Sequence, residues 1–201
     1  MIDLPTDLPA DIVPLSWLLG VWEGSGVIDY ESPERHFSGE FVQRVSFSHD
    51  GGDFVNYAAS AWFVADDGTR SPLLSEQGYW RVARHATDAD AGPALLPAPA
   101  PRQTPRTAED VETLRNAEGG FDIEVAIVRS DGVSELYVGQ VRGPRIDLAT
   151  DAVVRPATAK TYAAATRMYG LVDGHLLWAW DIAALGGALA SHASARLARA
   201  D

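Results

Sequence analysis

The chain has 201 residues, 46% of them hydrophobic and 22% charged, a composition typical of a folded protein with one core or one barrel around a ligand cavity. Its 28 acidic and 16 basic residues give a formal net charge of -12, so neither nucleic acid nor a membrane is expected as a partner. The absence of cysteine excludes disulfides, thiolate metal sites and a cysteine nucleophile, and any metal must be bound by nitrogen or oxygen.

The first residues predict a short extension followed by a short helix. Residues 1–14 lack the basic and apolar regions of a secretory signal, and no run of about 18 apolar residues occurs, so we expect a cytoplasmic location. Residues 10–19 have helical character, with Pro14 inside the segment and Gly20 ending it. We expect residues 1–201 to form a single domain, in which residues 1–14 are an N-terminal extension.

A glycine-rich motif, G-x-W-x-G-x-G, follows this helix and opens the first predicted strand. It consists of Gly20, Trp22, Gly24 and Gly26. Glycines inside a strand mark a bend or a close backbone approach, and the tryptophan could plug one end of a barrel. The motif differs from a phosphate loop, because it lacks the Gly-Lys-Ser/Thr ending and precedes a strand rather than a helix. We therefore assign it a structural role.

Strands and tight turns dominate the rest of the chain. Asp-Gly is the strongest short hairpin signal, because the turn needs positive φ at its centre. It occurs four times between runs of strand type, at Asp50-Gly51, Asp67-Gly68, Asp131-Gly132 and Asp173-Gly174. Apolar and polar residues alternate through residues 37–48, as in a half-buried strand. The other strands are expected at residues 22–30, 54–64, 78–84, 121–129, 133–141, 145–148, 159–168, 175–182 and 189–199.

Consecutive strands joined by tight turns, without crossover helices, indicate an antiparallel meander. A sheet of this many strands either splits into a sandwich or closes, and closure removes its exposed edges. The expected fold is therefore all-β, a closed antiparallel up-and-down β-barrel of about ten strands with a cavity. Residues 86–109 are rich in Pro, Ala and Asp, and they predict a mobile loop whose deletion should leave the fold intact.

Lys160 is the only lysine, against fifteen arginines, and it falls within the predicted strand at residues 159–168. A cation at the mouth of a cavity could pair with a ligand carboxylate. A solvated surface lysine explains the same residue equally well.

His192 differs from the other four histidines. Those lie at turns, at a strand start or beside the predicted loop, where solvation is expected: His36, His49, His85 and His175. His192 lies among small residues in segment 188–197, which would leave room for a planar ligand against the imidazole. A lone histidine in a strand is more often hydrogen-bonded or solvated than a metal ligand. Alternation also groups His192 with Ser194 and Arg196, opposite Leu197, so its face of the strand could be the outer one.

Several stretches resemble the nitrobindin family, which is also described as fatty-acid-binding-protein-like. The N-terminal stretch is LLGVWEGSG at residues 18–26, and the C-terminal one covers residues 133–199, including GVSELYVGQV, TRMYGLVDGHLLWAWDIAAL and GALASHASARLAR. Blocks at residues 47–51 and 75–81 also match. The resemblance implies a ten-stranded barrel similar to lipocalins, with one ferric haem b per chain in an open pocket.

The resemblance also implies roles for particular residues. His192 aligns with the histidine that is the axial ligand of the haem iron, and Lys160 with a haem-contacting position. Where the family usually has Tyr-Pro-Thr, with the threonine near the distal side of the haem, this chain has Tyr30-Glu31-Ser32, so Ser32 keeps the hydroxyl. A neutral imidazole is a suitable axial ligand, and its other ring nitrogen should find an acceptor. No catalytic residue beyond the haem iron is expected.

The function implied by the resemblance is isomerisation of peroxynitrite to nitrate, with nitric oxide as a further ligand. An alternative is a non-enzymatic carrier of a fatty acid or other apolar carboxylate, which would need only the cavity and an Arg or Lys at its mouth. A haem sensor or transfer protein is another. Two copies could also form a homodimer through an exposed strand face.

Overall fold

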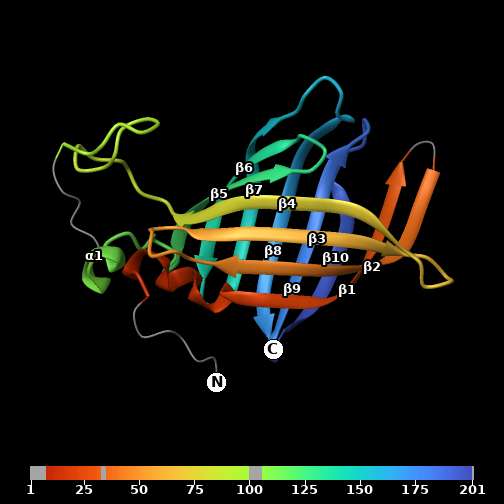
Figure 1. Ribbon diagram of the computed structural model, residues 1–201, viewed down its shortest axis with the longest axis horizontal. Helices are drawn as coiled ribbons and strands as arrows, with labels where there is room; N and C mark the ends of the chain where they lie inside the picture. The colour runs from red at the N-terminus through yellow and green to blue at the C-terminus, as the bar shows by residue number, and fades with distance from the viewer. Residues whose placement is uncertain (1–7, 33–34, 100–105, 201) are drawn as a thin grey trace.

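Ten antiparallel strands form the wall of a closed barrel in the computed structural model, which describes residues 8–32, 35–99 and 106–200 (Figure 1). In chain order they are β1 (Gly20–Ser32), β2 (Arg35–Ser48), β3 (Val55–Val64), β4 (Arg70–Val82), β5 (Phe121–Arg129), β6 (Ser134–Arg142), β7 (Arg145–Val154), β8 (Tyr162–Val172), β9 (His175–Ala184) and β10 (Ala190–Arg199). Each strand pairs with the next, and β10 pairs with β1. The predicted all-β, closed antiparallel barrel is confirmed.

The predicted turns join consecutive strands. Each Asp-Gly pair lies between two strands of a hairpin, and its glycine has the positive φ that the turn requires: Gly51, Gly68, Gly132 and Gly174. Apart from residues 83–120 between β4 and β5, the connections between neighbouring strands are short, because antiparallel partners need no crossover.

One end of the barrel is closed by a short helix. The predicted helical segment is a 3-10 helix, η1 (Ala10–Leu18), and Pro14 inside it has no backbone N–H to donate. Its residues Ile12, Leu15 and Leu18 are fully buried in the core. The indole N–H of Trp22 donates to the Leu18 carbonyl oxygen at 2.7 Å, which ties the start of β1 to this plug. Figure 1 shows η1 beside the short helix α1 (Ala108–Glu112) at this end.

Strand β4 begins at Arg70, eight residues before the predicted start at residue 78. The first part of β4 was not predicted as a strand because a bulge interrupts its alternation of apolar and polar residues. Ala61 pairs with Leu74 and Trp62 with Pro72, which leaves Leu73 as the extra residue. A proline is tolerated at such a position. Strand β7 likewise extends to Val154, beyond the predicted end at residue 148.

Of the segment predicted as a mobile loop, residues 86–109, the structure describes residues 86–99 and 106–109, and these make defined contacts. The guanidinium of Arg84 donates to both carboxylate oxygens of Asp90, at 2.8 and 2.5 Å. Thr107 and Asp110 form a capping box that starts α1, and Val111 of this helix is buried in the core. The helices among the described residues are all too short to cross a membrane.

Candidate functional site

A cavity of about 360 Å³ lies inside the barrel, at the end opposite η1. The connections β5–β6, β7–β8 and β9–β10 lie at its opening and contribute, among other lining residues, Asp131, Lys160 and Leu185. Most of its wall is apolar, including Phe41 and Trp178, and its volume is in the range of small-molecule sites. The plug at one end and the open cavity at the other make this interior the candidate site.

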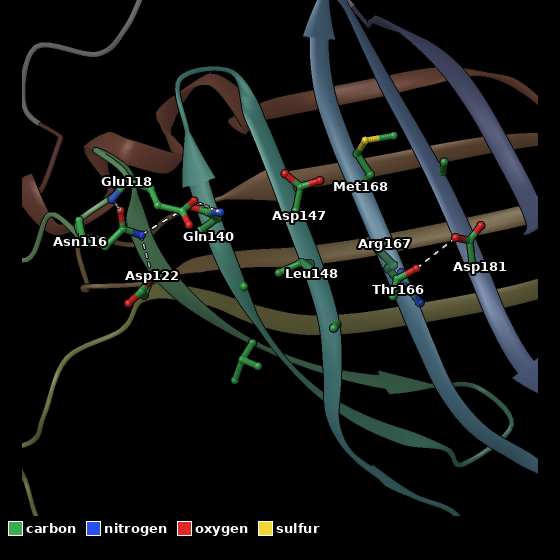
Figure 2. Close-up of a pocket in the computed structure, with 15 residues that line it drawn as sticks. Asn116, Glu118, Asp122, Gln140, Asp147, Leu148, Thr166, Arg167, Met168 and Asp181 are labelled. Atoms are coloured by element: carbon green, nitrogen blue, oxygen red, sulfur yellow. Dashed lines mark hydrogen bonds between the residues drawn. The ribbon is translucent and has the colours of Figure 1, made fainter. Parts of the chain in front are cut away.

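A larger hollow, of about 780 Å³, lies on the outer surface of the barrel over β6 to β9 (Figure 2). Four carboxylates line it: Glu118, Asp122, Asp147 and Asp181. Thr166 donates to Asp181 at 3.2 Å, and Asn116 donates to Asp122 at 2.8 Å. Its negative charge disfavours an anionic ligand. Among the described residues, no group of three or more His, Cys, Asp or Glu side chains is placed to hold a metal ion.

His192 faces the interior cavity because β10 contains a bulge at this residue. Ser191 pairs with Asp181 and Ala193 pairs with Trp180, the next residue along β9. His192 therefore has no partner in β9 and is the extra residue of the bulge. The extra residue shifts the alternation by one position, and both His192 and Ala193 line the cavity. The grouping of His192 with an outer face was therefore wrong. All five histidines lie within the described residues, and the other four do not line this cavity.

Two aromatic rings hold the His192 imidazole. Tyr30 and Trp180 both contact it edge to face, with ring centroids at 5.2 and 5.6 Å. Burial, and then the nearby Arg129 cation, lower the pKa of His192 below its usual value, so the neutral ring is favoured at pH 7. Its Nδ1 is buried without a hydrogen-bond partner among the described residues, so the expected acceptor is not found there. A neutral, fixed imidazole facing an apolar cavity has the properties of an axial haem ligand.

Lys160 lines the same cavity but is not in a strand. Strand β8 begins at Tyr162, so the prediction that Lys160 lies within a strand was wrong. Pro156 begins a turn that the Ala159 N–H closes at 3.0 Å, and this turn delays the strand. Lys160 is exposed at the rim, where an ammonium can meet a ligand carboxylate. Ser32 is the last residue of β1, and its side chain lies outside the described part of the chain.

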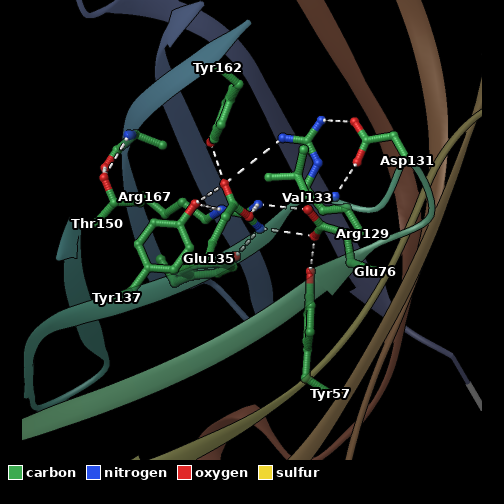
Figure 3. A network of polar contacts seen from close by, with 12 residues as sticks. Tyr57, Glu76, Arg129, Asp131, Val133, Glu135, Tyr137, Thr150, Tyr162 and Arg167 are labelled. Atoms are coloured by element: carbon green, nitrogen blue, oxygen red, sulfur yellow. Dashed lines mark hydrogen bonds and ion pairs between the residues drawn. The ribbon is translucent and has the colours of Figure 1, made fainter. Parts of the chain in front are cut away.

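Several residues that line the cavity also belong to a buried ionic cluster, which Figure 3 shows. Arg167 donates to both carboxylate oxygens of Glu76, at 3.0 and 2.6 Å, and to Glu135 at 3.4 Å. All three side chains are at most 5% exposed. Tyrosine hydroxyls complete the cluster, since Tyr57 donates to Glu76 at 2.7 Å and Tyr162 donates to Glu135. Burial opposes ionisation of Glu76, but the charge of Arg167 and the hydrogen bonds from Arg167 and Tyr57 outweigh this effect and lower the pKa of Glu76.

Sequence reasoning missed this cluster, although a signal was present. Arg167 lies two residues from Ala165 and from Tyr169, both of which are buried on the inner face of β8. Glu135 lies likewise between the buried Val133 and Tyr137. A charged residue on the apolar side of an alternating strand indicates a buried pair.

The glycine motif lies where β1 closes the barrel against β10. Gly26 pairs with Ala195, and a Cβ at Gly26 would collide with the carbonyl oxygen of Ser194. Gly24 makes a similarly close approach to the Arg196 carbonyl oxygen. Trp22, 1% exposed, packs in the core at the plugged end. The motif glycines thus let β1 approach the strand that carries His192.

The chain is similar to several known proteins over nearly its whole length. The family model described as "THAP4-like, heme-binding beta-barrel domain" matches residues 11–199. A protein of Leifsonia xyli subsp. xyli, named peroxynitrite isomerase, is 61% identical over the full length of both chains. One of Clavibacter michiganensis subsp. michiganensis with the same name is 59% identical, again over both full lengths. The crystal structure of Rv2717c from M. tuberculosis aligns with a TM-score of 0.68 at 28% identity, covering 99% of this chain and 100% of that one.

Proposed function

Because this chain belongs to the family of THAP4-like, haem-binding β-barrel domains, we propose that it binds one haem b through His192 and isomerises peroxynitrite to nitrate. The observation that carries the proposal is the bulge in β10, which turns a neutral imidazole into the apolar cavity. Relatives that share 61% and 59% of its residues over their full lengths are named peroxynitrite isomerase, which supports the reaction.

The residues of the cavity fit such a group. His192 would supply the nitrogen ligand, and Tyr30 and Trp180 would keep its ring from rotating. Lys160 at the rim would pair with a carboxylate of the cofactor. A contact between the hydroxyl of Ser32 and the bound group rests on the sequence resemblance alone. Bound iron supplies Lewis-acid chemistry toward the substrate oxygen. The apolar wall limits the access of water from the interior side.

Stopped-flow decay of peroxynitrite tests the reaction. The ferric, haem-loaded protein should speed decay above the rate given by the haem-free chain at equal concentration, because only the loaded form carries iron. Nitrate should account for the products. A loaded protein that leaves the decay rate at that of the haem-free chain would reduce the function to binding. A carrier of apolar carboxylates would instead exchange hemin for a fluorescent fatty acid in competition, with no acceleration.

We also propose a second ligand, a single-domain organisation and a homodimer. Nitric oxide is a second ligand of the bound iron, which an absorbance shift of the ferrous protein would report. The functional unit is one domain, residues 1–201, and replacing the exposed residues 93–97 by a short Gly-Ser linker leaves hemin binding unchanged. The chain forms a homodimer through an exposed strand face, which light scattering after size exclusion would measure.

A further inference from the structure

The wall of the interior cavity holds hydrogen-bond donors that have no acceptor. Nε and one terminal nitrogen of Arg129 are buried without a hydrogen-bond partner among the described residues, and so is Nε1 of Trp180. Both side chains line the cavity. A buried N–H without an acceptor costs free energy comparable to a lost hydrogen bond, and an unmet group of this kind indicates a missing ligand or water.

The nearby carboxylates do not accept from these donors, and each already accepts three hydrogen bonds from other groups. Glu76 accepts from Arg167 and Tyr57. Glu135 accepts from Arg167, Tyr162 and Tyr137, the last at 2.9 Å. The terminal nitrogen of Arg129 lies 3.9 Å from Glu135 Oε1, beyond hydrogen-bond distance. The surplus in this wall is therefore one of donors.

The side chains that carry these donors lie close to one another and to His192. The Cζ atom of Arg129 is 5.5 Å from the ring centroid of Trp180, and that ring is 5.6 Å from the imidazole. Arg129 is anchored at its other terminal nitrogen, which donates to Asp131 at 2.8 Å. The guanidinium is thus held in place at the cavity wall, and its remaining N–H groups do not need to be ordered when a ligand arrives.

We propose that Arg129 and Trp180 form a binding subsite for a small planar oxyanion inside the barrel. Such an anion carries only acceptors, and its shape suits both a guanidinium and an indole N–H. A water molecule would also need acceptors for its own two hydrogens, and Glu76 and Glu135 already accept three hydrogen bonds each. Identifying the physiological occupant as nitrate rests on the proposed function, whereas the subsite itself rests on the unmet donors.

Nitrate titration of the haem-free full chain, followed by ¹H–¹⁵N NMR, tests the subsite. The indole peak of Trp180, identified by its loss in Trp180→Phe, should shift and saturate with nitrate at constant ionic strength in chloride. The Nε–H peak of Arg129 provides a second reporter, which remains in Trp180→Phe. Arg129→Gln should weaken the apparent affinity at least tenfold, whereas Arg145→Gln, at an exposed arginine paired with Asp147, should not change it.

A parallel titration with acetate distinguishes the two sources of such an anion. Saturation by nitrate alone assigns the subsite to an inorganic oxyanion, and saturation by acetate shows that a carboxylate also fits it. Linear, equal shifts with nitrate, acetate and chloride would overturn the proposal, as would an unchanged nitrate affinity in a folded Arg129→Gln protein. Because the assay contains no haem, its failure leaves the role of His192 untouched, and His192→Ala should still bind nitrate.

Discussion

Two arginines in the same barrel differ in how their hydrogen bonds are met. Arg167, 4% exposed, is surrounded by Glu76, Glu135 and tyrosine hydroxyls that use its donors. Arg129, 12% exposed, donates to Asp131 and lies 3.9 Å from Glu135, and two of its nitrogens have no hydrogen-bond partner among the described residues. The first arrangement is sensitive to substitution, because removing one charge leaves its buried partners uncompensated. The second leaves binding capacity for a ligand. Burial alone therefore does not separate structural from functional charges.

Removing each arginine in turn should give the largest difference in the free energy of unfolding between the two sites. Arg167→Met leaves two carboxylates buried without their cation, and we expect a loss of about 3–5 kcal/mol in the free energy of unfolding. Arg129→Met removes the ion pair with Asp131, which is 45% exposed, and a longer contact of 3.9 Å with the buried Glu135, which keeps its pair with Arg167, so a smaller loss of about 1 kcal/mol is expected. Urea unfolding of both variants and the wild type measures the difference. Equal costs would remove the distinction between the two sites.

The same difference in stability should appear when a single tyrosine hydroxyl is removed from each site. Tyr57→Phe removes an O–H that donates to the buried Glu76, and about 1–3 kcal/mol should be lost. Tyr30→Phe removes a longer bond, 3.3 Å to the Ala184 carbonyl oxygen, and keeps the ring against His192, so a change within about 0.5 kcal/mol is expected. Thermal and urea unfolding should rank the variants in this order. A Tyr30→Phe protein as unstable as Tyr57→Phe would contradict it.

The pH dependence should show a smaller effect of the same cluster. The pKa of Glu76 is lowered in the folded protein relative to the ordinary value of 4.5, so the unfolded chain binds more protons near that pH. The stabilisation is complete above about pH 5 and is lost as the pH falls through the lowered value. Urea midpoints between about pH 7 and about pH 3.5 should decrease in this window. Glu76→Gln should flatten this decrease, and an unchanged slope would show that Glu76 does not contribute.

Local patterns in the sequence were sufficient to predict the barrel. Asp-Gly turns, and the alternation in residues 37–48 from which only Val42 and Gln43 depart, each reflect a short-range rule of backbone geometry. Short connections account for the strand order except between β4 and β5. The bulges could not be predicted this way. An extra residue at Leu73 or at His192 has no composition of its own, because it depends on how a neighbouring strand pairs.

The site was predictable only in part for the same reason. Resemblance identified His192, while alternation argued against it, and the structure shows that one bulge accounts for the conflict. Lys160 was expected in a strand and lies in a turn. Arg129 and Trp180 were not singled out, since a donor without an acceptor becomes visible only when every neighbour is placed.

The spectrum of the purified chain with added hemin tests the central claim, that the bulge in β10 presents His192 as the iron ligand. The wild type should give a stoichiometric Soret band, and so should His85→Ala, which replaces an exposed histidine away from the cavity. His192→Ala should fold and lose this band. An unchanged Soret band in the folded His192→Ala protein would contradict the account.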